Sequence, residues 1–180
     1  PEAVILFGGP QLPYSDSEFF DKHPYIDSIC VGEGEHVVEQ VLLDYLDNKP
    51  IEKIVRAERI KDMKLPSPYL DGVFDELMAE HPEVLWNPTL ETDRGCPYKC
   101  TFCDWGGLTN SKVYKFELDR VFAEIEWFAK HKMDFITMTT ANFGIFKERD
   151  GLIVDKMIEE CQKTGFPKKM TTSWVKNGNA

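Results

Sequence analysis

The chain has 180 residues, with 21 Lys and Arg against 31 Asp and Glu, which gives a formal net charge of −10 at pH 7. This charge argues against a protein that coats nucleic acid, because non-specific binding to phosphates depends on clustered Lys and Arg. With 42% hydrophobic and 12% aromatic residues, the composition is typical of a globular protein and excludes a disordered one.

No segment of the sequence reads as a membrane span or a secretion signal. The longest apolar run, residues 3–7, is too short to cross a bilayer, and no signal-peptide pattern precedes it. Three of the five cysteines lie within eight residues, which suits metal ligation in a reducing compartment better than disulfides. We therefore expect a cytoplasmic protein with neither a membrane nor a nucleic-acid partner. Since the chain opens without Met in a strand-like run, we also expect it to be a piece of a longer protein.

The first fifty residues predict two strand–helix pairs. Residues 3–7 and 26–31 are short, continuous apolar runs, which predict two fully buried strands. Ser15 and Glu18 form a capping-box pattern, which predicts the start of a short helix between the two strands. After the second strand, apolar residues recur at helical spacing: Val38, Val41, Leu42 and Tyr45. This alternation is typical of a parallel sheet covered by helices.

The remaining residues predict a linker and then three more strands with two helices. Residues 51–84 are mixed, charged and punctuated by prolines, which predicts a linker. Strands are predicted at 86–91, 135–140 and 170–175. The first helix has the apolar face Leu118, Val121, Phe122, Ile125 and Phe128, and the second has Val154, Met157, Ile158 and Cys161. Gly165 is expected to end the second helix.

A cysteine motif follows the first of these three strands. Cys96, Cys100 and Cys103 have Cys-x3-Cys-x2-Cys spacing. A cluster with four irons needs four outside ligands, so three thiolates leave one iron open to another ligand. The motif also lies at the carboxyl end of its strand, where α/β barrels and open sheets bind their ligands. The spacing therefore predicts an iron–sulfur site with an open catalytic position.

Two other readings of the same cysteines stay open. A structural zinc site usually needs four ligands, and the fourth would have to be Cys30, Cys161 or a distant histidine. Alternatively, the three thiols are ordinary buried core residues, as free cysteines often are.

With Phe102 directly before the last cysteine, the motif resembles the signature of the radical S-adenosylmethionine (SAM) enzymes. The resemblance implies that Cys96, Cys100 and Cys103 bind a 4Fe-4S cluster and that Phe102 lies beside the adenine of SAM. In this family the open iron is chelated by the amino and carboxylate groups of SAM. One electron from the reduced cluster then cleaves SAM to a 5′-deoxyadenosyl radical.

The resemblance extends, with departures, to the next two strands. Asn142 follows the strand at 135–140, where the family usually has a carboxylate-bearing segment near the SAM amino group. The resemblance implies that its amide takes that contact; the alternative is a plain turn residue. Ser173 on the third strand would reach the ribose or carboxylate of SAM, or else lie in a solvated loop.

The glycine-containing segments of the first fifty residues are similar to the end of the cobalamin-binding domain that precedes the barrel in one large subgroup of this family. Glycines at the end of a parallel strand permit the close approach of a bulky ligand, although a tight turn would also explain them. The resemblance implies that Gly8, Gly9, Gly32 and Glu33 lie along cobalamin. None of the four histidines has the Asp-x-His-x-x-Gly context of a lower cobalt ligand.

The expected fold is α/β, made of two partial domains. Residues 1–50 would be the C-terminal part of a Rossmann-like (flavodoxin-like) cobalamin-binding domain. Residues 51–84 would be the linker, and residues 85–180 the N-terminal part of a radical SAM (β/α) barrel.

The expected function is that of a radical SAM enzyme with a 4Fe-4S cluster, SAM and cobalamin. The resemblance implies a methyltransferase that acts on an unactivated carbon, although other members of the subgroup rearrange or oxidise their substrates. The expected partners are a small-molecule or peptide substrate and an external one-electron reductant. The alternative is a non-catalytic iron–sulfur or zinc-binding module.

Overall fold

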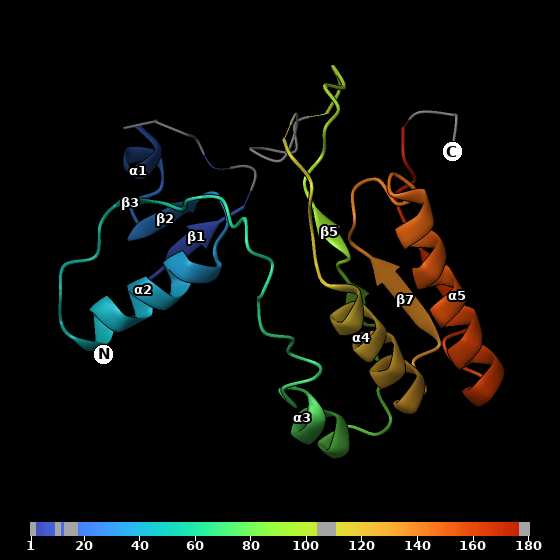
Figure 1. Ribbon diagram of the computed structural model, residues 1–180. Coiled ribbons are helices and arrows are strands. Elements are labelled where there is room, and N and C mark those ends of the chain that lie inside the picture. Colours follow the sequence, from blue (N-terminus) through green and yellow to red (C-terminus); the bar gives the residue numbers. More distant parts are fainter. Residues whose placement is uncertain (1–2, 10–11, 13–17, 104–110, 177–180) are drawn as a thin grey trace. The chain divides into compact units, whose positions relative to one another are not determined.

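The computed structural model describes residues 3–9, 12, 18–103 and 111–176, and the chain divides into two compact units (Figure 1). The first unit consists of Pro1–Lys61 and Cys100–Thr109, and the second of Asp62–Lys99 and Asn110–Ala180. Each unit contains a three-stranded parallel sheet, which confirms the predicted mixed α/β class.

The first unit is built on a sheet with the order β1-β2-β3. Its strands are β1 (Leu6–Gly8), β2 (Ser28–Val31) and β3 (Ile54–Arg56), and its helices are α1 (Glu18–Lys22) and α2 (Glu35–Leu46). Side chains alternate between the two faces of the central strand. Ile29 and Val31 pack against Phe19 and Phe20, whereas Cys30 packs against the buried side of α2. The predicted buried second strand is confirmed, since all of β2 is buried.

The prediction of a fully buried strand over residues 3–7 is wrong. The strand begins only at Leu6, and the side chains of Val4, Ile5 and Phe7 are 37–42% exposed. The physical reason is position: in the described part of the chain, β1 is an edge strand with β2 as its one neighbour. The capping box predicted at Ser15 lies outside the described residues.

The apolar stripe predicted for α2 is confirmed at Val41, whereas Val37 is buried in place of the predicted Val38. Val37 and Val41 are buried against Cys30, as are no other residues of this helix. Val38 and Leu42, which were predicted to face the sheet, are 42% and 57% exposed. Two adjacent apolar stripes run along this helix, and packing on β2 selects one of them.

The predicted linker contains β3 and α3 (Asp75–Glu80). Because β3 pairs in parallel with β2, the first unit extends beyond residue 50 to Lys61. Val55 adds to the apolar cluster around Cys30, and the Ser28 hydroxyl donates a hydrogen bond of 2.7 Å to the Glu52 carbonyl. These contacts join the strand to the sheet although its apolar run is too short to predict a strand.

The second unit contains a sheet with the order β4-β7-β8. Its elements are β4 (Thr89–Leu90), β7 (Phe135–Met138), β8 (Lys169–Thr171), α4 (Leu118–Lys130) and α5 (Lys147–Thr164). All three strands are parallel, so the three strands predicted in this half of the chain are confirmed in shorter form. An antiparallel pair that the sequence did not predict, β5 (Asp93–Arg94) with β6 (Tyr114–Lys115), brackets the cysteine motif.

The helices of the second unit match their predicted faces unequally. In α4 the predicted residues Val121, Ile125 and Phe128 are fully buried. In α5 the predicted Met157 is buried together with Ile153, whereas the predicted Ile158 is 49% exposed. Gly165 adopts a left-handed φ of 83° directly after α5, which confirms the predicted helix end. Among the described residues, no helix is long and apolar enough to span a bilayer.

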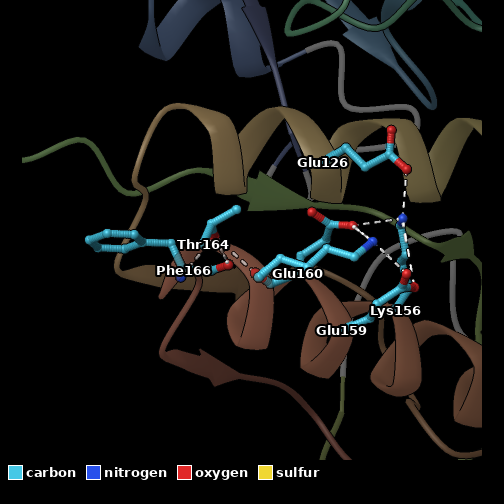
Figure 2. A network of polar contacts seen from close by, with 7 residues as sticks. Glu126, Lys156, Glu159, Glu160, Thr164 and Phe166 are labelled. Carbon is cyan, nitrogen blue, oxygen red and sulfur yellow. Dashed lines mark hydrogen bonds and ion pairs between the residues drawn. The ribbon is translucent and has the colours of Figure 1, made fainter.

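An ion pair joins α4 to α5, which lie beside each other (Figure 2). Lys156 Nζ donates to Glu126 Oε1 at 2.6 Å and to Glu160 Oε1 at 2.9 Å. The hydrogen bond that Lys156 donates to Glu126, followed by the one that it donates to Glu160, raises the pKa of the Lys156 ammonium. The Lys156 side chain is 13% exposed and that of Glu160 is 10% exposed, so both charges are shielded from water.

Replacing Lys156 by methionine is expected to destabilise the second unit by about 1–3 kcal/mol, because Glu160 keeps a nearly buried charge but loses its closest partner. Urea unfolding followed by tryptophan fluorescence measures this loss, since three of the four tryptophans lie in this unit. Lys168→Met is the matched control: Lys168 pairs with Asp134, both about half exposed, and little change is expected. Equal losses in the two variants would contradict the prediction.

Candidate functional site

Cys96, the first cysteine of the motif, is held firmly at the start of its loop. It belongs to the second unit and is 7% exposed. Its backbone N–H donates to Ser111 Oγ at 3.2 Å, and its carbonyl accepts from the Ser111 N–H at 2.7 Å. The positive φ of Gly95, 123°, allows the sharp change of direction after β5. The Cys96 sulfur therefore has a defined position near the carboxyl end of β4.

The other two cysteines of the motif lie in the first unit. Cys100 is half-buried, Cys103 is exposed, and the Cys103 N–H donates to the Cys100 carbonyl at 3.1 Å. Phe102 is 87% exposed. All three cysteines are free thiols, and within the described residues no three His, Cys, Asp or Glu side chains are gathered as metal ligands. The joint ligand role of the three cysteines stays a prediction.

Asn142 lies directly against the first cysteine. Its Nδ2 donates a hydrogen bond of 3.2 Å to Cys96 Sγ, and the residue is 1% exposed. Its Oδ1 is buried and has no hydrogen-bond partner among the described residues. The parallel sheet brings these residues together, because Cys96 follows β4 and β5 whereas Asn142 follows the neighbouring strand β7.

The loop that carries Asn142 is fixed to the loop after β8. The Phe143 N–H donates to the Ser173 carbonyl at 2.8 Å, and the Val175 N–H donates to the Phe143 carbonyl at 3.0 Å. Ser173 therefore lies beside Asn142 at the same sheet edge, with its own side chain exposed. Two of the predicted SAM contacts are thus adjacent, although their roles stay predictions.

Asp150, in the first turn of α5, shapes the turn after Asn142. Its Oδ2 accepts from the Gly144 N–H at 2.8 Å and from the Phe146 N–H at 3.1 Å. Gly144 has a φ of 94°, which requires glycine. The sequence analysis did not identify Asp150. Its position could have indicated the role, because an aspartate in the first turn of a helix often accepts the free N–H groups there.

A buried polar network supports the same edge of the sheet, and sequence reasoning missed it. Thr92 Oγ1 lies 2.8 Å from Thr140 Oγ1 and 3.0 Å from Asp93 Oδ2. Arg149 Nη2 donates to the Thr92 carbonyl at 3.0 Å and to the Phe116 carbonyl at 2.6 Å. These bonds tie the ends of β4, β6 and β7 to α5. Burial raises the pKa of Asp93 to about 6, and the hydrogen bond from Thr92 opposes that rise.

The predicted cobalamin residues of the first unit gather at one edge of their sheet. Gly8 pairs with Cys30 in the parallel register, so the segments after β1 and β2 begin side by side. Gly9 has a φ of 107°, and an added Cβ would meet nothing within 4 Å. The backbone at Gly8-Gly9 is therefore exposed at this edge, and its contact with cobalamin stays a prediction.

Gly32 and Glu33 also stabilise the first unit through contacts with the segment after β3. Gly32 has a φ of 108°, and a Cβ there would lie 3.1 Å from the Ala57 carbonyl oxygen. Glu33 Oε2 accepts from the Ile60 N–H at 2.9 Å, and its Oε1 lies 3.7 Å from Arg59 Nε. These contacts fasten the segment after β3 to the end of β2, a role that the resemblance did not imply.

Two methyltransferases are similar in sequence to almost the whole chain. Over 99% of its length it is 37% identical to the cobalamin-dependent radical SAM methyltransferase TokK of Streptomyces tokunonensis. It is 36% identical, again over 99%, to the 2-(S-pantetheinyl)-carbapenam-3-carboxylate methyltransferase of Streptantibioticus cattleyicolor. This chain belongs to the cobalamin-dependent radical SAM enzyme family. It spans 29% of the length of each of these two relatives.

A solved structure shows the same fold for this radical SAM chain. The radical S-adenosylmethionine methyltransferase TsrM from Kitasatospora setae matches with a TM-score of 0.54 and 13% sequence identity. The match covers 92% of this chain and 35% of TsrM. No protein-family model matches the chain.

Asp93→Asn is expected to stabilise the second unit at pH 7–8 by about 1–3 kcal/mol, because ionised Asp93 is buried at a cost. Since its folded pKa of about 6 lies above the ordinary value of 3.8, the stability that protonated Asp93 contributes is fully present below pH 3.8 and is lost as the pH rises through 6. The gain should therefore shrink toward pH 5, as measured by urea unfolding at several pH values. A gain that is the same at every pH would contradict this origin.

Gly32→Ala is expected to destabilise the first unit by about 2 kcal/mol or more, because the new Cβ meets the Ala57 carbonyl and alanine disfavours a positive φ. Hydrogen–deuterium exchange of the β2 and β3 amides should become faster. Gly34→Ala is the matched control, since Gly34 has a φ of −83° and its nearest neighbour, Val38 Cγ2, is 3.9 Å away. Equal exchange in both variants would overturn the steric explanation.

Proposed function

We propose that the protein containing this chain is a cobalamin-dependent radical SAM methyltransferase. The observation that carries the proposal is the placement of Cys96. The first cysteine of the motif is buried at the carboxyl edge of a parallel sheet, with an amide N–H directed at its sulfur. The two relatives that cover 99% of the chain are both named as methyltransferases, which supports the reaction class.

Cys96, Cys100 and Cys103 would hold the 4Fe-4S cluster. The residues present fit this group in their donor chemistry, since iron–sulfur clusters bind cysteine thiolates and all three thiols are free. The hydrogen bond from Asn142 also suits Cys96 as a thiolate, because a negatively charged sulfur accepts N–H groups well. Half-buried Cys100 and exposed Cys103 are accessible to iron and sulfide.

SAM would bind beside this loop. Asn142 Oδ1 is a buried acceptor without a partner, so it would accept a hydrogen bond from the SAM ammonium group. The exposed Ser173 hydroxyl would donate to the ribose or carboxylate, and exposed Phe102 would stack on the adenine. When bound, the cluster would supply the electron that cleaves SAM, and cobalamin would supply the methyl group. The chain's own part is to orient these groups and to exclude water.

The first unit would be the end of a cobalamin-binding Rossmann-like domain, and the second unit the start of a radical SAM (β/α) barrel. Two segments of the first unit would lie along cobalamin. They are the exposed backbone at Gly8 and Gly9 and the end of β2 at Gly32 and Glu33. The structural contacts of Gly32 and Glu33 make them supports of this edge as well as candidate contacts.

The proposed substrate is a small molecule. The name of the second relative states a carbapenam carboxylate as its substrate, so we propose a small carboxylate of this class as the first to test. A non-catalytic iron–sulfur or zinc module is not favoured, because the relatives are named as enzymes.

Replacing Cys96, Cys100 or Cys103 by alanine is expected to abolish both cluster assembly and SAM cleavage, because each would be an iron ligand. The full protein is reconstituted anaerobically with iron and sulfide and reduced with dithionite. Iron content and 5′-deoxyadenosine are then measured. Cys161→Ala, which removes a half-buried thiol on α5, is the matched control and should retain both. A cluster that survives in all three motif variants would refute the proposed function.

A further inference from the structure

We propose that Asn142 is a positioning residue that raises the reduction potential of the cluster through its hydrogen bond to Cys96. The inference rests on the proposed function, since it assumes that Cys96 binds the cluster. It concerns the Nδ2 end of the side chain, whereas the contact proposed above for SAM concerns the Oδ1 end. A measurement made without SAM therefore reports on the Nδ2 end alone.

The geometry of the contact is that of a true hydrogen bond to sulfur. Asn142 Nδ2 lies 3.2 Å from Cys96 Sγ, and the two residues are 1% and 7% exposed. Water is therefore a poor competitor for the sulfur on this side. In a buried setting the interaction of the N–H dipole with a thiolate is stronger than it would be in water.

Both partners are fixed by their backbones, so the contact needs no rearrangement when the cluster changes charge. Ser111 holds the Cys96 backbone through its hydroxyl and its N–H. The Asn142 carbonyl accepts from the Ile145 N–H at 3.1 Å, and the next residue, Phe143, is bonded to Ser173 at 2.8 Å. The amide is thus held in place before any cofactor binds.

The direction of the effect follows from charge. One electron passes from an external reductant to the cluster, and the added negative charge is shared with the sulfur ligands. An N–H group directed at one of these sulfurs stabilises the reduced state more than the oxidised state. Asn142 therefore makes the cluster easier to reduce. No proton needs to leave the amide in this step.

The test measures the midpoint potential of the cluster in the full protein, loaded with iron and sulfide, without SAM. Asn142→Leu fills a similar volume without a donor, and Asn142→Ala removes the donor and leaves space. In both variants the ratio of reduced to oxidised cluster at a fixed potential should fall by roughly three- to tenfold, where tenfold corresponds to 59 mV for a one-electron couple. Ser28→Ala is the matched control: it removes another fully buried polar group, a hydroxyl in the first unit that donates to the Glu52 carbonyl, so the potential should stay unchanged.

Unchanged midpoints in both Asn142 variants would overturn the inference while leaving the proposed function intact. A fall in only one of them would indicate a packing effect and would also overturn it. Wild-type protein without any 4Fe-4S cluster would instead refute the proposed function itself.

A spectroscopic measurement on the wild type decides the matter if neither variant assembles a cluster. Asparagine is labelled with nitrogen-15, and the reduced cluster is examined by electron spin-echo envelope modulation. A nitrogen coupling from a side-chain amide is expected, because Nδ2 is directed at a cluster sulfur. Absence of any such coupling would overturn the inference.

Discussion

Parallel pairing of β4, β7 and β8 is the constraint on which the candidate site depends. Strands that run in the same direction deliver the segments that follow them to one edge of the sheet. Cys96 and Asn142, which are 46 positions apart in the chain, meet at this edge. The pairing continues past the strand ends through the bridge between Phe143 and Trp174, which keeps the loop after β7 against the loop after β8.

The carboxyl edge of this sheet is supported by buried polar groups. Arg149 reaches two backbone carbonyls, Asp150 accepts two backbone N–H groups, and Thr92 joins Thr140. Hydrogen bonds are directional, so such a network specifies the course of a loop more narrowly than apolar contacts do. It does so at a cost, which is visible in the raised pKa of Asp93. A polar edge of this kind suits loops that must present side chains in a fixed arrangement.

Helix periodicity alone was insufficient to identify the buried faces of α2 and α5. Both helices carry adjacent apolar pairs, such as Val37 with Val38 and Met157 with Ile158, so two neighbouring stripes have the same spacing. Which stripe is buried depends on the neighbouring strand. In each pair the earlier residue, Val37 or Met157, is the buried one. α4 carries adjacent apolar pairs too, such as Val121 with Phe122, but there the predicted residues Val121, Ile125 and Phe128 are fully buried.

The sequence by itself determined the order of β4, α4, β7, α5 and β8 in the second unit, the end of α5 and the spacing of the three cysteines. These features are local, because they depend on apolar runs, glycine and neighbouring residues along the chain. Only the tertiary structure decided that β3 joins the first sheet, that Asp93 is buried and that Asn142 donates to Cys96. Each of these depends on residues far apart in the chain, and the direction and register of strand pairing, which bring such residues together, leave no local pattern in the sequence.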